Sequence, residues 1–137
     1  MSAVLALTLL LGATPAAVDN SFGDRVMQGK MIEAGPTGPA YQKALWSKIG
    51  DPTTDALKGC ITSNEPADRS PFTLVADVQA NGKPTRIEVL PPTPVATCLA
   101  GQFATWALPA PPAKPSPYTI EIDFSMPQHA KSQNAKH

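Results

Sequence analysis

The stretch Phe72-Thr73-Leu74-Val75-Ala76-Asp77-Val78-Gln79, followed by Asn81-Gly82, decides the fold. Phe72, Leu74, Ala76 and Val78 fall on one face, and Thr73, Asp77 and Gln79 fall on the other. This period of two is typical of a half-buried strand. Asn-Gly is the strongest short-range hairpin signal, because a type I′ turn needs positive φ at both central residues. The stretch therefore predicts the first two strands of an antiparallel hairpin.

A two-residue loop at Asn81-Gly82 also predicts the register of the hairpin. It places Ala76 opposite Ile87 and Leu74 opposite Val89 on the apolar face, and Asp77 opposite Arg86 on the polar face. A slip of one residue would turn every side chain to the wrong face.

A helix and a third strand follow the hairpin. Thr93 is a good N-cap and Pro94 suits the first helical position, so we expect a helix over about 94–107. Its apolar stripe consists of Val95, Cys98, Leu99, Gln102, Phe103 and Trp106. The Pro-rich run 108–117 predicts a stiff extended connector, and the clean alternation over 118–124 predicts the last strand.

The residues before the hairpin favour helices. Met27, Met31 and Ile32 have helical spacing, and we interpret the two methionines as core packing rather than a metal or oxidant site. A second helix is expected over 39–49, ended by Gly50-Asp51-Pro52. Thr53 or Thr54 would then cap a short helix through Ile61, which places Cys60 where that helix enters the sheet.

The first 17 residues are typical of a secretory signal peptide, with an apolar run followed by small residues. The alternative is a membrane anchor, but about 11 apolar residues are fewer than the roughly 20 that a spanning helix needs. We therefore expect a periplasmic or secreted protein with no stable membrane span after cleavage. The chain carries 11 basic and 11 acidic residues, and this balance argues against a nucleic-acid partner.

The chain has two cysteines, Cys60 and Cys98. In an exported protein an even number suggests a disulfide, and two separately buried thiols are the alternative. A bridge between them would close a loop of about 40 residues and contribute roughly 3–4 kcal/mol in the loop-entropy model.

No catalytic or metal constellation stands out. Both histidines, His129 and His137, lie in the polar C-terminal stretch, and neither Ser70 nor Ser116 has an ordered histidine to activate it. A set of carboxylates, Glu88, Glu121 and Asp123, is best interpreted as a solvated outer face of the sheet. We therefore expect a protein that is not an enzyme and that binds no cofactor or metal.

The order of elements resembles the C-terminal domain of the TonB and TolA proteins, and is most similar to the related AgmX-type periplasmic domain. The resemblance rests on Asn81-Gly82-Lys83 at the turn, on the places of Cys60 and Cys98, and on Trp106 followed by Pro109 and Pro111. It covers about residues 57–126. It implies an α+β fold of two layers, α-β-β-α-β, with a three-stranded antiparallel or mixed sheet whose first strand is central. It also implies a location in the bacterial envelope and partner binding.

We therefore expect four parts in the chain: a signal peptide (1–17), an N-terminal helical lead-in (18–52), a TonB C-terminal-like domain (53–126) and a disordered tail (127–137).

The expected function is binding of a protein partner at a sheet edge. Pro84 protects the edge of the second strand. The expected site is therefore the edge of the last strand, formed by Thr119, Ile120, Glu121, Ile122 and Asp123. Its acidic side chains would favour a basic or hydroxyl-rich peptide. Two alternatives to a free edge remain equally open. A second copy of the chain could pair with this edge in a homodimer, or the segment 26–32 could cover it. The alternative function is a secreted inhibitor or immunity-type protein that blocks a periplasmic enzyme, with the Pro-rich connector or the 63–71 turn as the plug.

Overall fold

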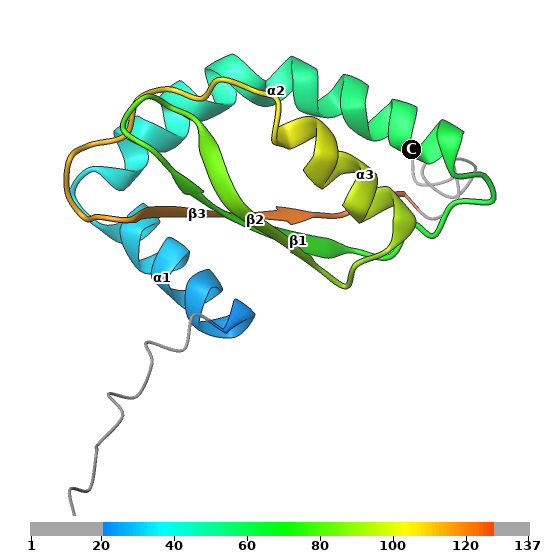
Figure 1. Cartoon of the computed structure of the whole chain (residues 1–137), viewed down its shortest axis with the longest axis horizontal. Helices are drawn as coiled ribbons and strands as arrows, with labels where there is room; N and C mark the ends of the chain where they lie inside the picture. The colour runs from blue at the N-terminus through cyan, green and yellow to red at the C-terminus, as the bar shows by residue number, and fades with distance from the viewer. Residues whose placement is uncertain (1–20, 128–137) are drawn as a thin grey trace, which may run out of the picture.

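The computed structural model describes residues 21–127. The expected signal peptide, both histidines and residues 128–137 lie outside the described residues. The described chain contains helices α1 (Phe22–Ala34), α2 (Gly38–Ser63) and α3 (Pro94–Phe103). Its strands are β1 (Phe72–Val78), β2 (Pro84–Leu90) and β3 (Tyr118–Phe124). Figure 1 shows α2 running lengthwise over the sheet with α3 beside it.

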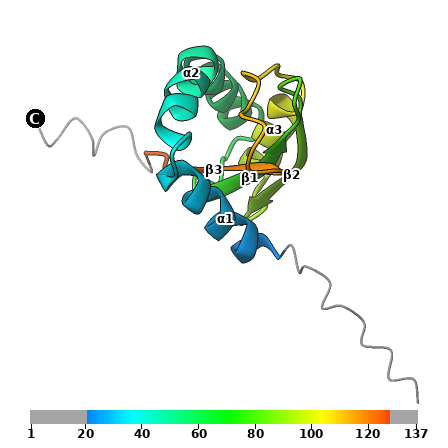
Figure 2. The same ribbon diagram turned by 90° about the vertical axis from the view of Figure 1, so that its left-hand side faces the viewer.

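The three strands form an antiparallel sheet in the order β2-β1-β3, so β1 is central. The apolar face of the sheet packs against α2 and α3, and α1 lies on the opposite face (Figure 2). The expected α+β fold with a three-stranded sheet is confirmed. The α-β-β-α-β unit is present as two layers, and α1 adds a third layer on the outer face.

The hairpin differs from the predicted one at its turn. Leu74 lies opposite Val89 as expected, but Asp77 lies opposite Thr85 instead of Arg86. The amide of Gly82 donates to the Gln79 carbonyl, and only Gly82, with φ of 87°, has positive φ in the loop. This is a three-residue loop whose last residue is left-handed. A bulge at Arg86, with φ of 51°, takes up the extra residue and restores the register beyond it.

Gly82 also lies against the backbone of Leu108, which leaves no room for a side chain. Its carbonyl accepts a hydrogen bond of 2.9 Å from the Leu108 amide, and a Cβ at this position would collide with the Leu108 carbonyl. The turn of the hairpin thus lies directly against the start of the Pro-rich connector. Positive φ and this close approach together select glycine.

The predicted helix break at Gly50-Asp51-Pro52 is wrong, because α2 continues through Pro52 to Ser63. Proline removes one helical hydrogen bond and usually kinks or ends a helix. Here the buried face continues in phase on both sides of it, through Tyr41, Leu45, Ile49, Thr53 and Cys60. The tertiary packing of this stripe outweighs the local cost. The boundary drawn between residues 52 and 53 therefore falls inside one helix.

In α1 the two methionines are exposed, and the arginine at the start of the helix is buried instead. Met27 and Met31 are 60% and 68% exposed, so the expectation that they pack in the core is wrong. Ile32 is buried as expected, and the guanidinium of Arg25 is buried against the outer face of the sheet. Ser21 caps the helix by accepting a hydrogen bond from the amide of Asp24.

The helix α3 ends at Phe103, a turn earlier than predicted, and its N-cap Thr93 accepts from the Ala96 amide as expected. The connector that follows has no helix or strand until Tyr118. At the C-terminal end, Met126 is buried and the Pro127 carbonyl accepts a hydrogen bond from Arg69.

Candidate functional site: the edge of β3 and the adjoining groove

The predicted edge residues of β3 are mostly covered. Thr119, Ile120, Glu121 and Ile122 are buried, and Asp123 alone among the five is exposed. The interpretation of Glu121 as part of a solvated outer face is therefore wrong, and it is α1 that covers it. The segment 26–32 thus packs on the outer face of β3, whereas the alternative considered from the sequence was coverage of its edge.

Coverage of β3 follows from the path of the chain around it. On the outer face, Gly29 of α1 lies so close that a Cβ there would be 3.1 Å from Cγ of Glu121. The chain then turns at residues 35–37 and begins α2 on the inner face, where the Tyr41 ring lies 4.8 Å from the ring of Tyr118. This burial raises the pKa of Tyr41 to about 12. The start of β3 is therefore enclosed from both faces (Figures 1 and 2).

The backbone of β3 still presents unpaired groups toward its outer side. The Gln79 amide donates to the carbonyl of Lys83, the residue before β2, so alternate residues of β1 bond toward β2 and the intervening ones bond toward β3. In the observed register this turns the N–H and C=O groups of Thr119, Glu121 and Asp123 away from β1. The same alternation points the missing N–H of Pro84 away from β1, as predicted.

A cluster of charged groups lies where α1 crosses β3. The ammonium of Lys30 lies 3.7 Å from carboxylate oxygens of both Glu121 and Asp123, and these two neighbours raise its pKa. Burial and the Glu121 carboxylate raise the pKa of Glu33 to about 7, and burial together with Asp123 raises that of Glu121. One oxygen of Glu121, Oε2, is buried without a hydrogen-bond partner among the described residues. A proton held between Glu33 and Glu121 would satisfy that oxygen.

A second polar cluster fixes the start of α1 to the sheet. Nη1 of Arg25 donates to the Arg86 carbonyl at 2.7 Å and to Glu88 at 2.8 Å, and Nη2 donates to Asp77 at 3.2 Å. Asp77 is buried and also accepts from Thr119 at 2.9 Å and from Arg86 at 3.2 Å. The bulge at Arg86 is therefore what directs a carbonyl toward Arg25. Both terminal nitrogens of Arg25 and both carboxylate oxygens of Asp77 have partners within the cluster, so we interpret it as structural.

Beyond Ile122 the strand emerges beside a groove of about 450 Å³, which we name the α2–β3 groove. One wall is the side of α2 that includes Trp46, Thr53, Leu57, Lys58 and Ile61, and the other is the segment 123–127. Along that segment Phe124 and Met126 are buried, whereas Asp123, Ser125 and Pro127 are exposed. Trp46 is 40% exposed. Large exposed aromatic side chains in a concave apolar surface are typical of partner-binding sites.

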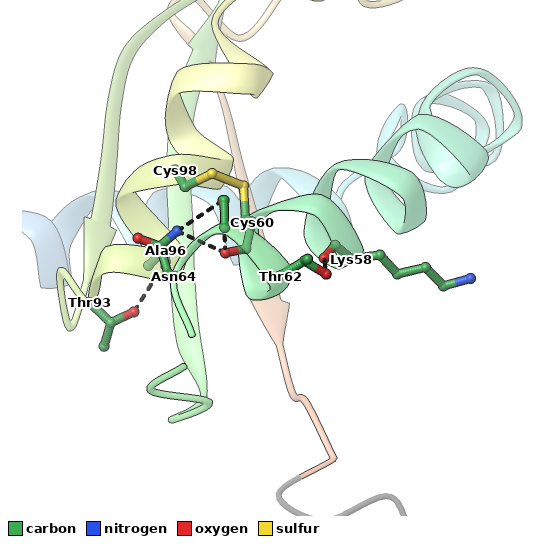
Figure 3. Close-up of a disulfide and its surroundings, with 8 residues drawn as sticks. Lys58, Cys60, Thr62, Asn64, Thr93, Ala96 and Cys98 are labelled. Atoms are coloured by element: carbon green, nitrogen blue, oxygen red, sulfur yellow. Dashed lines mark hydrogen bonds between the residues drawn. A yellow bond between two sulfur atoms is a disulfide. The ribbon is translucent and has the colours of Figure 1, made fainter. Parts of the chain in front are cut away.

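The opposite side of α2 is joined to α3 by a disulfide. Cys60 and Cys98 are bonded at an S–S distance of 2.05 Å, with Cα atoms 5.7 Å apart (Figure 3). The predicted pairing is confirmed. A disulfide is typical of proteins in an oxidising compartment, which fits a secreted or periplasmic protein. Figure 3 also shows the side chain of Lys58 extending away from the disulfide. Lys58 is one of the residues that line the α2–β3 groove.

The rest of the described chain offers no obvious reactive centre. Ser70 bonds to Asp68 at 2.6 Å in an exposed turn, and this bond lowers the pKa of Asp68. Within residues 21–127 no group of three or more His, Cys, Asp or Glu side chains is placed to hold a metal ion. In the same range no helix combines the length and the apolar character that crossing a membrane requires.

The comparisons with known proteins identify no relative. No family model matches the chain, no curated protein matches it, and no solved structure matches it.

Proposed function

We propose that this chain is an exported, non-enzymatic protein-interaction domain of the bacterial envelope that binds a partner chain at the end of β3. The observation that carries the proposal is the segment 123–127, with Asp123, Ser125 and Pro127 exposed, which continues an edge strand directly beside the apolar α2–β3 groove. Edge strands with unpaired backbone groups readily accept a further strand. The resemblance to TonB and TolA domains supports partner binding and an envelope location.

We infer that a partner strand pairs with the end of β3 only. Residues 119–122 are buried and α1 packs closely over Glu121. We therefore place the pairing from Asp123 onward, where Asp123, Ser125 and Pro127 are exposed. The proposed surface is therefore the C-terminal end of the predicted edge rather than its whole length.

Site-specific photo-cross-linking tests this proposal. A photoreactive residue is placed at exposed Ser125 and, as a matched control, at exposed Ala104 after α3. In cells that make the protein, we expect one discrete adduct from position 125 and none from position 104. Adducts from neither position, or the same adducts from both, would contradict binding at β3.

The identity of the adduct separates the proposed classes of function. A hydrolase cross-linked from the connector, at exposed Ala113, would favour the inhibitor function instead. A second copy of the chain cross-linked from position 125 would identify a homodimer through this edge.

A further inference from the structure

We propose that the α2–β3 groove binds an extended peptide in which a bulky apolar residue is followed, two positions away, by an acidic residue that pairs with Lys58. The inference rests on the proposed binding of a partner at β3, and it specifies the chemistry of that partner.

The groove has a shape that suits an extended peptide lying along α2. A strand added beside segment 123–127 would point alternate side chains toward α2 and the others toward α1. The side chains that point toward α2 meet the apolar wall formed by Trp46, Leu57 and Ile61. Two residues of a strand advance about 6.6 Å, close to the 5.4 Å of one helical turn. Neighbouring inward side chains of the peptide thus meet successive turns of α2.

The charged groups on the rim of the groove also bear on the peptide that it binds. Asp123 already has partners, because it accepts from the Thr73 hydroxyl at 2.6 Å and lies 3.7 Å from the Lys30 ammonium, which it shares with Glu121. Arg69 is engaged by Glu65 and by the Pro127 carbonyl. Lys58 is exposed and forms no ion pair with any carboxylate of residues 21–127. Among the charged groups that line the groove, Lys58 is thus the one without an oppositely charged partner in residues 21–127, and its ammonium complements an acidic residue of the peptide rather than the basic one expected from sequence.

An unpaired hydroxyl lies in the wall of the groove. Oγ1 of Thr53 is buried and has no hydrogen-bond partner among the described residues. Buried polar groups in folded proteins are almost always paired, so an unpaired one calls for an explanation. A backbone or side-chain group of a bound peptide would supply the missing partner. In contrast, Thr54 on the next position of α2 bonds to the Gly50 carbonyl at 3.2 Å.

Synthetic peptides provide the test. The probe is a seven-residue peptide of threonines with one leucine and, two residues later, one glutamate, made in both orders. One control peptide replaces glutamate with lysine, and another replaces leucine with serine. Binding to the full mature protein is measured by calorimetry, and by Trp46 fluorescence in a Trp106→Phe background. We expect the leucine–glutamate peptide to bind at least fivefold tighter than either control peptide.

Variants of the protein locate the binding. We expect Trp46→Ala to lower the affinity for the leucine–glutamate peptide about tenfold or more, as is usual when a central aromatic contact is lost. Lys58→Glu should weaken it about fivefold and remove the preference over the leucine–lysine peptide. The matched control is Lys48→Glu, which makes the same charge change at an exposed position of α2 outside the groove. It should change the affinity less than twofold.

The possible outcomes separate this inference from the proposed function. Equal binding of all three peptides, equal effects of Lys58→Glu and Lys48→Glu, or no binding of any peptide would overturn the inference. If cross-linking from position 125 still succeeds in those cases, the proposed binding at β3 stands with a different chemistry. If cross-linking also fails, both are overturned. A far-UV spectrum and melting curve for each variant exclude loss of folding as the cause.

Discussion

Replacing Arg25 with methionine tests the role of the buried charge cluster in holding α1 on the sheet. Methionine keeps most of the apolar length of the side chain but removes its three hydrogen bonds, to Arg86, Glu88 and Asp77. Hydrogen bonds to charged groups contribute about 1.5–3 kcal/mol each. The sum over three such bonds is an upper limit for the loss of unfolding free energy. The expected loss is well below this sum, because Glu88 is half exposed and bonds to water once Arg25 is removed.

Two partners also remain for the buried Asp77 carboxylate, namely Arg86 and Thr119. We therefore expect Arg25→Met to lower the free energy of unfolding by about 3 kcal/mol, the lower end of the cost of breaking a buried ion pair. Urea denaturation followed by circular dichroism measures this loss. With a urea slope of about 1–3 kcal/mol per M, typical of small proteins, this loss appears as a downward shift of about 1–3 M in the midpoint.

Two control variants make the result specific. Glu88→Gln should cost less than about 1 kcal/mol, since that carboxylate is half exposed. Lys43→Met changes an exposed residue of α2 and should leave stability within about 0.5 kcal/mol of the parent. If Arg25→Met also stays within about 1 kcal/mol of the parent protein, the cluster does not hold α1 in place and the reasoning is refuted.

Three further predictions concern α1 and the disulfide. Gly29→Ala should destabilise by about 1–2 kcal/mol, because its Cβ would press on Glu121; unchanged urea denaturation would show that α1 can shift. Glu33 has a pKa of about 7 in the folded protein and an ordinary value near 4.5 when unfolded. Its stabilising contribution is complete below pH 4.5 and is lost as pH rises through 7, by about 1 kcal/mol after allowing for solvent screening. In Glu33→Gln this part of the pH dependence of stability should vanish. A stability-versus-pH curve parallel to that of the parent protein would contradict the raised pKa of Glu33. Replacing both Cys60 and Cys98 by alanine should cost roughly 3–4 kcal/mol, and thiol labelling of the unfolded, unreduced parent should find no free thiol.

Thr53→Val isolates the unpaired hydroxyl of the groove. Because it removes a buried polar atom without a partner at nearly constant volume, it should raise stability by about 1 kcal/mol. Thermal unfolding checks this, and Thr54→Val, which removes a bonded hydroxyl, is the matched control. A loss of stability in Thr53→Val would show that the hydroxyl is bonded in solution.

The local patterns of the sequence determined the elements of the sheet and its inner face. Alternation over 72–78 and 118–124 set the strands β1 and β3, and the same alternation selected the residues that face α2 and α3. Asn81-Gly82 indicated the position of the turn correctly, although the predicted two-residue loop was wrong and the loop has three residues. Since a bulge at Arg86 compensates the extra loop residue, the register is correct again at Leu74 and Val89. The helical stripes carrying Cys60 and Cys98 likewise predicted the disulfide.

Some of what was missed had a signal in the sequence. The buried stripe of α2 runs at intervals of four residues from Tyr41 to Thr53, across the proline that was interpreted as a stop. Val75 lies on the otherwise polar face of β1 and is fully buried. An apolar residue there indicates that something covers that face. Gly29 within α1 is a further sign, because a helix that approaches a strand closely needs a residue without a side chain.

Only the tertiary structure decided what covers the outer face and which part of the β3 edge is left open. The coverage by α1 depends on Arg25, which finds acceptors more than fifty residues away in Asp77, Arg86 and Glu88. No local pattern encodes such partners, because the gain appears only when the bulge and the strand pairing have already brought them together. The same assembly pairs Asp123 with Lys30 and leaves Lys58 without a carboxylate partner among residues 21–127, so which charged groups have partners depends on the fold rather than on the strand sequence.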